Sequence, residues 1–175
     1  MEKRPAWNSR ANVLTGARLL LAPVLAVCVL EEARLAAALS FWLAVATDFA
    51  DGRVARRFGE VSAYGRFFDH ATDAAFVSVG TAALAVKNAV PAVLPLLIAL
   101  AFVQYAVGRR EPGAQEPRKS RLGHWNGIAY YVIVAVPVTR DAMGIAWPPP
   151  AWVLFAGWLL VATTLVSIGS RLRFA

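Results

Sequence analysis

Long apolar segments separated by short polar breaks make up most of this chain. The breaks contain charged or turn-forming residues, such as Glu31-Glu32, Lys87-Asn88 and Pro148-Pro149-Pro150. Several apolar segments approach the roughly 17–25 residues that a helix needs to cross a hydrocarbon core. We therefore predict an all-α, polytopic membrane protein with six transmembrane helices, the fifth fraying at both ends. The predicted helices are about Asn12–Leu30, Ala33–Arg57, Gly65–Val86, Ala89–Gly108, Trp125–Val138 and Ala151–Ser170.

The composition supports the membrane class. Of the 175 residues, 58% are hydrophobic and 17% are charged, whereas about a quarter of the residues in an ordinary soluble domain are charged. The length fits one domain over residues 1–175, and no linker or repeat marks a second one. We expect no cleaved signal peptide, because no small-residue cleavage site follows the first apolar segment. A single cysteine, Cys28, excludes an intrachain disulfide.

Basic residues gather in alternate breaks rather than in one patch, which argues against nucleic acid as a partner despite the net charge of +7. They precede the first helix, surround the second and fourth breaks, and end the chain. The other breaks hold only Arg34, Lys87 and Arg140. Because positively charged loops stay on the cytoplasmic side, we expect both termini and the second break to face the cytoplasm.

Four aspartates flank the second break. Asp48 and Asp51 are three positions apart near the end of one predicted helix, and Asp69 and Asp73 are four apart near the start of the next. Each pair shares a helix face, and the turn between the helices brings the faces together. Carboxylates beside a bilayer are costly, and four at close range repel one another unless a cation balances them. Oxygen ligands favour Mg²⁺, Mn²⁺ or Ca²⁺ over zinc, and two such ions can clamp a diphosphate.

Residues between the aspartates suit a phosphate ligand. Gly52 and Ala55 leave space on the helix face, as Gly65 does on the facing helix, and Arg56 offers a planar fork for phosphate oxygens. The arginines near the aspartates are Arg53, Arg56, Arg57 and Arg66. Any single aspartate could instead be a solvated helix end paired with one of them, but the complete set favours a functional site.

The spacing D-x2-D-G-x2-A-R-x8-G-x3-D-x3-D, which runs from Asp48 to Asp73, resembles the signature of the CDP-alcohol phosphotransferases. These are integral membrane enzymes of phospholipid biosynthesis. Asn12, Thr15 and Arg18, followed by Pro23, resemble the first-helix pattern of bacterial members. The resemblance covers about half of the chain well, and the last three helices match only in layout.

This resemblance implies a reaction and a set of roles. A phosphatidyl group would pass from a CDP-linked lipid, with CDP-diacylglycerol as the expected donor, to the hydroxyl of an acceptor alcohol, and CMP would leave. Two Mg²⁺ or Mn²⁺ ions would be held by Asp48, Asp51, Asp69 and Asp73. Asp73 would also act as the general base. The CDP moiety would bind at Gly52, Ala55, Arg56 and Gly65.

The resemblance also implies a homodimer in the bacterial inner membrane, with its active site facing the cytoplasm. Candidate residues for a substrate phosphate or the acceptor are Arg18, Arg110, Arg118 and Arg121. Arg18 lies inside the first helix, so it should point into the bundle toward the aspartates or a phosphate unless it snorkels to the surface. His70 should face away from the metals, because neighbouring residues on a helix point about 100° apart.

The acceptor stays open. Phosphatidylglycerophosphate synthases of this family use glycerol 3-phosphate and typically carry Asp-Pro-x-x-Asp-Lys around the last two aspartates, with an Arg-Glu pair in the fourth helix. Here His70 and Ala74 replace the proline and the lysine, and Gln104-Tyr105 stands in the fourth helix. A different alcohol is therefore an alternative to glycerol 3-phosphate. A small cation carrier or channel is the alternative from another class, but it would spread acidic residues through the membrane depth.

Overall fold

The computed structural model describes residues 10–58, 63–108 and 121–172. Within these ranges the chain forms helices and no strands, which confirms the all-α prediction. The six helices are α1 (Arg10–Leu30), α2 (Arg34–Phe58), α3 (Ala63–Val86), α4 (Leu94–Gly108), α5 (Arg121–Met143) and α6 (Pro150–Leu172).

The two largest differences from the predicted helix bounds are the start of the fourth helix and the end of the fifth. The fourth helix begins at Leu94 instead of Ala89, since Pro91 lacks an N–H and disfavours helical backbone at the residue before it. The fifth helix continues through Pro137 to Met143, and Gly144 follows with a φ of +65°. A glycine with positive φ directly after a helix is a common C-terminal stop.

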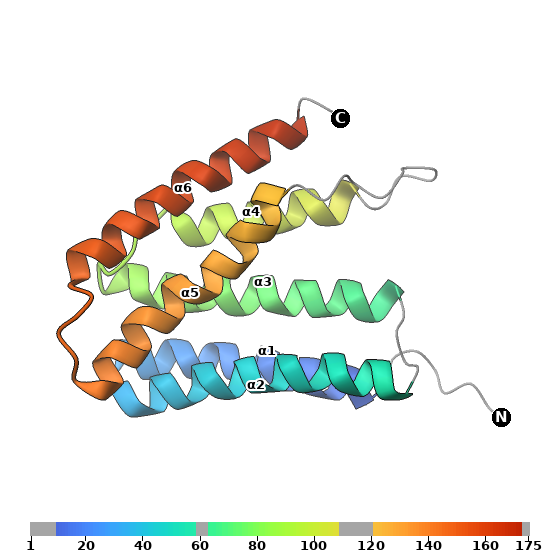
Figure 1. Ribbon diagram of the computed structural model, residues 1–175, viewed down its shortest axis with the longest axis horizontal. Coiled ribbons are helices and arrows are strands. Elements are labelled where there is room, and N and C mark those ends of the chain that lie inside the picture. Colours follow the sequence, from blue (N-terminus) through green and yellow to red (C-terminus); the bar gives the residue numbers. More distant parts are fainter. Residues whose placement is uncertain (1–9, 59–62, 109–120, 173–175) are drawn as a thin grey trace.

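Helix α1 packs against α2 and α3, and α3 also packs against α4. Helix α5 contacts α2, α3 and α6, while α6 returns against α4. In Figure 1, α1 to α4 run alongside one another, and α5 crosses them obliquely. The N-terminal ends of α1 and α3 lie on the same side as the C-terminal ends of α2 and α4, at the right of Figure 1. The fold therefore brings the end of α2 and the start of α3 to one end of the bundle.

The core and the outer surface are both apolar. Leu25, Phe41, Phe76, Leu94 and Val134, one from each of the first five helices, are almost fully buried. Large apolar side chains also point outward, and the most exposed are Leu20 on α1 at 73%, Phe155 on α6 at 72% and Trp147 in the segment before α6 at 71%. Exposure of so many large apolar side chains to water is unfavourable.

One segment among the described residues, Pro150–Ser170, is both long and apolar enough to cross a membrane by length and composition. Two shorter apolar helical segments are Thr15–Leu30 and Leu94–Val107. Within the described ranges the prediction of six helices is thus confirmed, and α6 is the helix there that is both long and apolar enough to span a membrane. The other helices are shorter in their apolar part or carry charged and polar residues over part of their length.

Gly157 on α6 marks a close approach between α6 and the segment that leads into α4. A Cβ at Gly157 would lie 2.5 Å from Cδ of Pro91, whereas a Cβ at Gly169 on the same helix would meet nothing within 4 Å.

We expect Gly157→Ala to lower the free energy of unfolding by about 1–3 kcal/mol, because Pro91 and α6 must move apart. Gly169→Ala is the control and should be neutral or slightly stabilising. Thermal unfolding in detergent measures both variants, and equal Tm values would contradict this packing.

Candidate functional site

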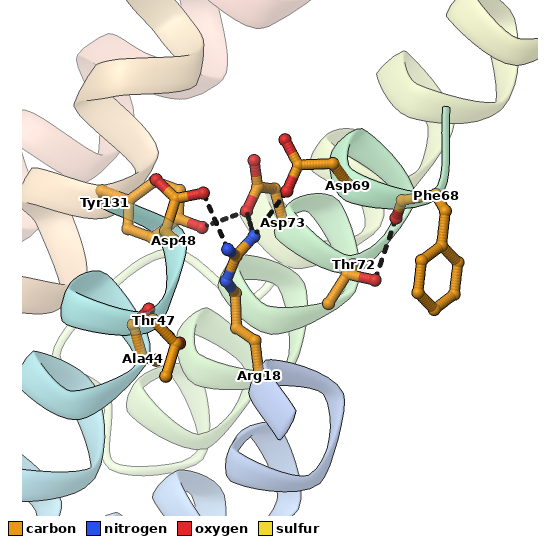
Figure 2. A network of polar contacts seen from close by, with 9 residues as sticks. All are labelled: Arg18, Ala44, Thr47, Asp48, Phe68, Asp69, Thr72, Asp73 and Tyr131. Atoms are coloured by element: carbon orange, nitrogen blue, oxygen red, sulfur yellow. Dashed lines mark hydrogen bonds and ion pairs between the residues drawn. The ribbon is translucent and has the colours of Figure 1, made fainter. Parts of the chain in front are cut away.

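A buried arginine of α1 connects the aspartates of α2 and α3. Arg18 is 0% exposed. Its Nη2 lies 2.7 Å from Oδ1 of Asp48 on α2, and its Nη1 lies 3.1 Å from Oδ1 of Asp69 on α3. Nη1 also donates to Oδ1 of Asp73, one turn further along α3. Figure 2 shows the three carboxylates gathered around this one guanidinium group. The prediction that Arg18 points toward the aspartates is confirmed, and the snorkelling alternative is wrong.

Threonines beside the aspartates bond to their own helices. The hydroxyl of Thr72 donates to the Phe68 carbonyl at 2.9 Å, and that of Thr47 donates to the Ala44 carbonyl at 2.7 Å. Such bonds to the preceding turn satisfy the hydroxyl groups locally. The guanidinium group of Arg18 therefore meets the carboxylates without competition from these two side chains (Figure 2).

Tyr131 of α5 adds a second donor to Asp73. Its hydroxyl donates to Oδ1 of Asp73 at 2.6 Å. Its ring stacks on Phe76 with a centroid distance of 6.2 Å and an interplanar angle of 23°, and it lies 6.3 Å from the ring of Phe41. The sequence prediction missed Tyr131, because two consecutive tyrosines in an apolar helix give no signal that one of them reaches a carboxylate.

The charges of the network do not cancel. Among the described side chains, three carboxylates surround one guanidinium, so these four groups carry two excess negative charges when all of them are ionised. The Arg18 side chain is 0% exposed, whereas the side chains of Asp48, Asp69 and Asp73 are 43%, 34% and 26% exposed. The excess negative charge therefore lies on the accessible side of the cluster, where a cation can approach.

His70 lies closer to the aspartates than expected. A ring nitrogen of His70 and carboxylate oxygens of Asp69 and Asp73 all lie within 4.8 Å of one another. The prediction that His70 faces away from this site is wrong, because the reach of the imidazole makes up for the angular offset along the helix. Its ring meets Tyr105 of α4 edge-on, with 5.7 Å between the centroids.

The donor set fits a divalent cation. Carboxylate oxygens with one optional imidazole are typical ligands of Mn²⁺, and carboxylates alone suit Mg²⁺. The two uncompensated negative charges match the charge of one such ion. Among the described residues, Asp69, His70 and Asp73 of α3 have donor atoms close enough together to share one such ion.

The solvated alternative, in which an aspartate pairs with a nearby arginine of its own segment, can be compared with the structure only at Arg53, since the side chains of Arg56, Arg57 and Arg66 lie outside the described part. Asp48 pairs with Arg18 of another helix. The guanidinium carbon of Arg53 instead lies 4.0 Å from the ring centroid of Phe49.

Other predicted residues are only partly placed. Gly65 lies on α3, one turn before Asp69, and is half-buried, while Arg121 is the exposed first residue of α5. Four predicted residues occupy α2, but their side chains lie outside the described part of the structure: Asp51, Gly52, Ala55 and Arg56. Arg110 and Arg118 also lie outside the described residues. The roles of these six residues stay predictions.

The model of the CDP-alcohol phosphatidyltransferase family matches residues 8–169. The chain belongs to the CDP-alcohol phosphatidyltransferase family. The resemblance drawn from the spacing of the aspartates is thus confirmed. Because the match reaches residue 169, it includes α4, α5 and most of α6, which the sequence related to the CDP-alcohol phosphatidyltransferases only by layout.

Similar curated proteins are phosphatidyltransferases. The CDP-diacylglycerol--glycerol-3-phosphate 3-phosphatidyltransferase of Rickettsia typhi is 37% identical over 103 residues, which are 57% of each chain. The cardiolipin synthase (CMP-forming) / mitochondrial hydrolase fusion protein of Schizosaccharomyces pombe is 38% identical over 151 residues, which are 75% of this chain and 25% of that protein. The match spans little more than half the length of the rickettsial enzyme. No solved structure matches the chain.

Removing the guanidinium group should expose the repulsion within the cluster. We expect Arg18→Gln to lower the free energy of unfolding by about 1–3 kcal/mol in the presence of a chelator, since three carboxylates then face one another without a partner. Mg²⁺ should restore more stability to this variant than to the wild type, because it replaces the missing positive charge. Thermal unfolding in detergent with chelator and with Mg²⁺ measures both effects.

Arg53→Gln is the matched control, since Arg53 is an arginine on α2 that contacts Phe49. It should unfold like the wild type under both conditions. If Arg18→Gln behaved like Arg53→Gln, Arg18 would not be the group that balances the aspartates.

Proposed function

We propose that this chain transfers a phosphatidyl group from a CDP-linked lipid to the hydroxyl of an acceptor alcohol and releases CMP. The observation that carries the proposal is the cluster of Asp48, Asp69 and Asp73, which retains excess negative charge in a member of the CDP-alcohol phosphatidyltransferase family. CDP-diacylglycerol is the proposed donor, since the rickettsial relatives are named for it.

The reaction exchanges the phosphoanhydride bond of the CDP-linked lipid for a phosphate ester bond to the acceptor alcohol. The acceptor oxygen forms a bond to the phosphorus on the lipid side of the diphosphate, and the bond from that phosphorus to the CMP oxygen breaks. The hydroxyl proton passes to the carboxylate of Asp73, and CMP leaves with the electron pair of the broken bond. A general base of this kind typically contributes 10²–10⁴-fold to the rate.

Two Mg²⁺ or Mn²⁺ ions would be held by Asp48, Asp51, Asp69 and Asp73. When bound, such ions neutralise the charge that develops on the phosphate oxygens. The residues of the chain hold the carboxylates in place for this chemistry. Arg18 draws the carboxylates of two helices together, and its contact with a substrate phosphate stays a prediction.

The proposed setting is the bacterial inner membrane, with six membrane-spanning helices and both termini in the cytoplasm. Exposed apolar side chains such as Leu20, Trp147 and Phe155 support contact with lipid. A CDP-lipid keeps its acyl chains in the bilayer and its diphosphate at the surface. A cluster near one end of a helical bundle suits that position. The homodimer implied by the family resemblance stays a prediction.

The relatives direct the choice of acceptors to be tested. Glycerol 3-phosphate appears in the names of the rickettsial enzymes, and the fission yeast protein is a cardiolipin synthase. His70, Ala74 and Gln104 depart from the pattern of the glycerol-3-phosphate enzymes. The amide of Gln104 donates to the Ile168 carbonyl of α6 at 3.1 Å, so it helps to join α4 to α6. The proposal therefore includes both a phosphorylated alcohol and a lipid alcohol as acceptors.

CMP release tests the proposal. The purified chain is incubated with CDP-diacylglycerol, Mg²⁺ or Mn²⁺, and a panel of glycerol 3-phosphate, phosphatidylglycerol, glycerol and inositol. We expect CMP release with at least one acceptor and its loss on chelation. Asp73→Asn should lower kcat about 10²–10⁴-fold, because the amide cannot accept the hydroxyl proton. Asp141→Asn is the control, since Asp141 pairs with Arg140 at 2.7 Å and is not part of the cluster.

If no acceptor in the panel gave CMP, the transferase proposal would fail, and a cation carrier or channel would become the better explanation. Activity that survives in Asp73→Asn would remove the general-base role from Asp73 while leaving the transferase intact.

A further inference from the structure

We infer that Tyr131 is a positioning residue of this site. Its hydroxyl, together with Arg18, holds one oxygen of Asp73, so that the second oxygen is presented to the metal and the acceptor hydroxyl. The catalytic part of this inference rests on the proposed function. The part that concerns metal binding does not.

Both donors meet the same atom. Nη1 of Arg18 and the hydroxyl of Tyr131 donate to Oδ1 of Asp73, the latter at 2.6 Å. They come from α1 and α5, so two helices fix the rotation of a carboxylate that belongs to a third. Figure 2 shows the other oxygen of Asp73 turned away from Arg18. Because a carboxylate that is held at one oxygen cannot rotate freely, the other oxygen keeps one direction.

The tyrosine is itself held by aromatic packing. Its ring stacks on Phe76 at 6.2 Å and lies 6.3 Å from Phe41, and both phenylalanines are almost fully buried. Aromatic contacts at these distances are favourable beyond the burial of area. The hydroxyl therefore reaches Asp73 from a ring with little freedom, which is what a positioning role requires.

The alternative is that Tyr131 only fills space in the core, and that its hydrogen bond does not orient Asp73. The two explanations differ in what the hydroxyl does. Groups that hydrogen-bond a metal-binding carboxylate orient it, and their loss typically costs 10–100-fold in metal affinity or activity. A space-filling tyrosine would lose stability without this specific effect.

The neighbouring residue provides a matched control. The hydroxyl of Tyr130 lies 2.6 Å from Oγ1 of Thr164 on α6, and its side chain is 8% exposed. The hydroxyl of Tyr130 thus bonds to a residue of α6, although Tyr130 directly precedes Tyr131 in the same helix. Replacing either tyrosine with phenylalanine removes one hydroxyl, and within the described part of the structure the hydroxyl of Tyr131 is the one that donates to Asp73.

The experiment compares Tyr131→Phe with Tyr130→Phe in the full chain. Electron paramagnetic resonance gives the affinity for Mn²⁺ without any turnover, CMP release gives kcat and the donor KM, and thermal unfolding gives Tm. We expect Tyr131→Phe to bind Mn²⁺ about tenfold more weakly and to lose about 10–100-fold in kcat, with the donor KM within about twofold of the wild type. Tyr130→Phe should keep the wild-type Mn²⁺ affinity and kcat, even if its Tm falls.

Two results would overturn the inference: wild-type Mn²⁺ affinity in Tyr131→Phe, or equal losses in both variants that follow their Tm values. The failure of the proposed function is separate from either. If the wild type released no CMP and Tyr131→Phe still bound Mn²⁺ more weakly than Tyr130→Phe, the transferase proposal would fall, and the positioning of Asp73 by Tyr131 would stand.

Discussion

The fully buried guanidinium group of Arg18 is the interaction on which the rest of this structure depends. A buried charge costs several kcal/mol unless it is paired, and the removal of its partners is strongly destabilising. Arg18 finds its partners on α2 and α3, at Asp48, Asp69 and Asp73. The three helices therefore have to approach one another in the register that places these side chains together. Helix α5 joins the same network through the hydroxyl of Tyr131.

The same pairing leaves negative charge that a ligand can balance. One guanidinium compensates one of three carboxylates, and the carboxylates are more exposed than the arginine that gathers them. The guanidinium group of Arg18 thus stabilises the helix packing from the buried side of the cluster, while net negative charge of the carboxylates remains on the exposed side. A divalent ion is the natural counter-charge, and an ion held there attracts a diphosphate. This connects the packing of α1, α2 and α3 to the chemistry that family membership implies.

Sequence reasoning succeeded where the physical constraint was local. The apolar segments predicted six helices, and the four-residue spacing placed Asp69 and Asp73 on a shared face of α3. The cost of an arginine against lipid predicted that Arg18 points inward. It failed where the answer depended on tertiary contacts. The sequence prediction ended the fifth helix at Val138, five residues before the end of α5 at Met143. Tyr131 reaches Asp73 across 58 positions, and His70 comes near the aspartates through the reach of its side chain.

The central claim is that the carboxylates around Arg18 bind a divalent cation and, through it, a diphosphate. Isothermal titration of CDP into the purified chain tests this claim directly, with Mg²⁺ and with chelator, for the wild type and for Asp69→Asn. The account predicts CDP binding by the wild type in Mg²⁺, with little or none in chelator, because the uncompensated carboxylates repel the diphosphate. Asp69→Asn should bind CDP much more weakly in Mg²⁺. Equal CDP affinity with and without the metal, or in Asp69→Asn and the wild type, would contradict it.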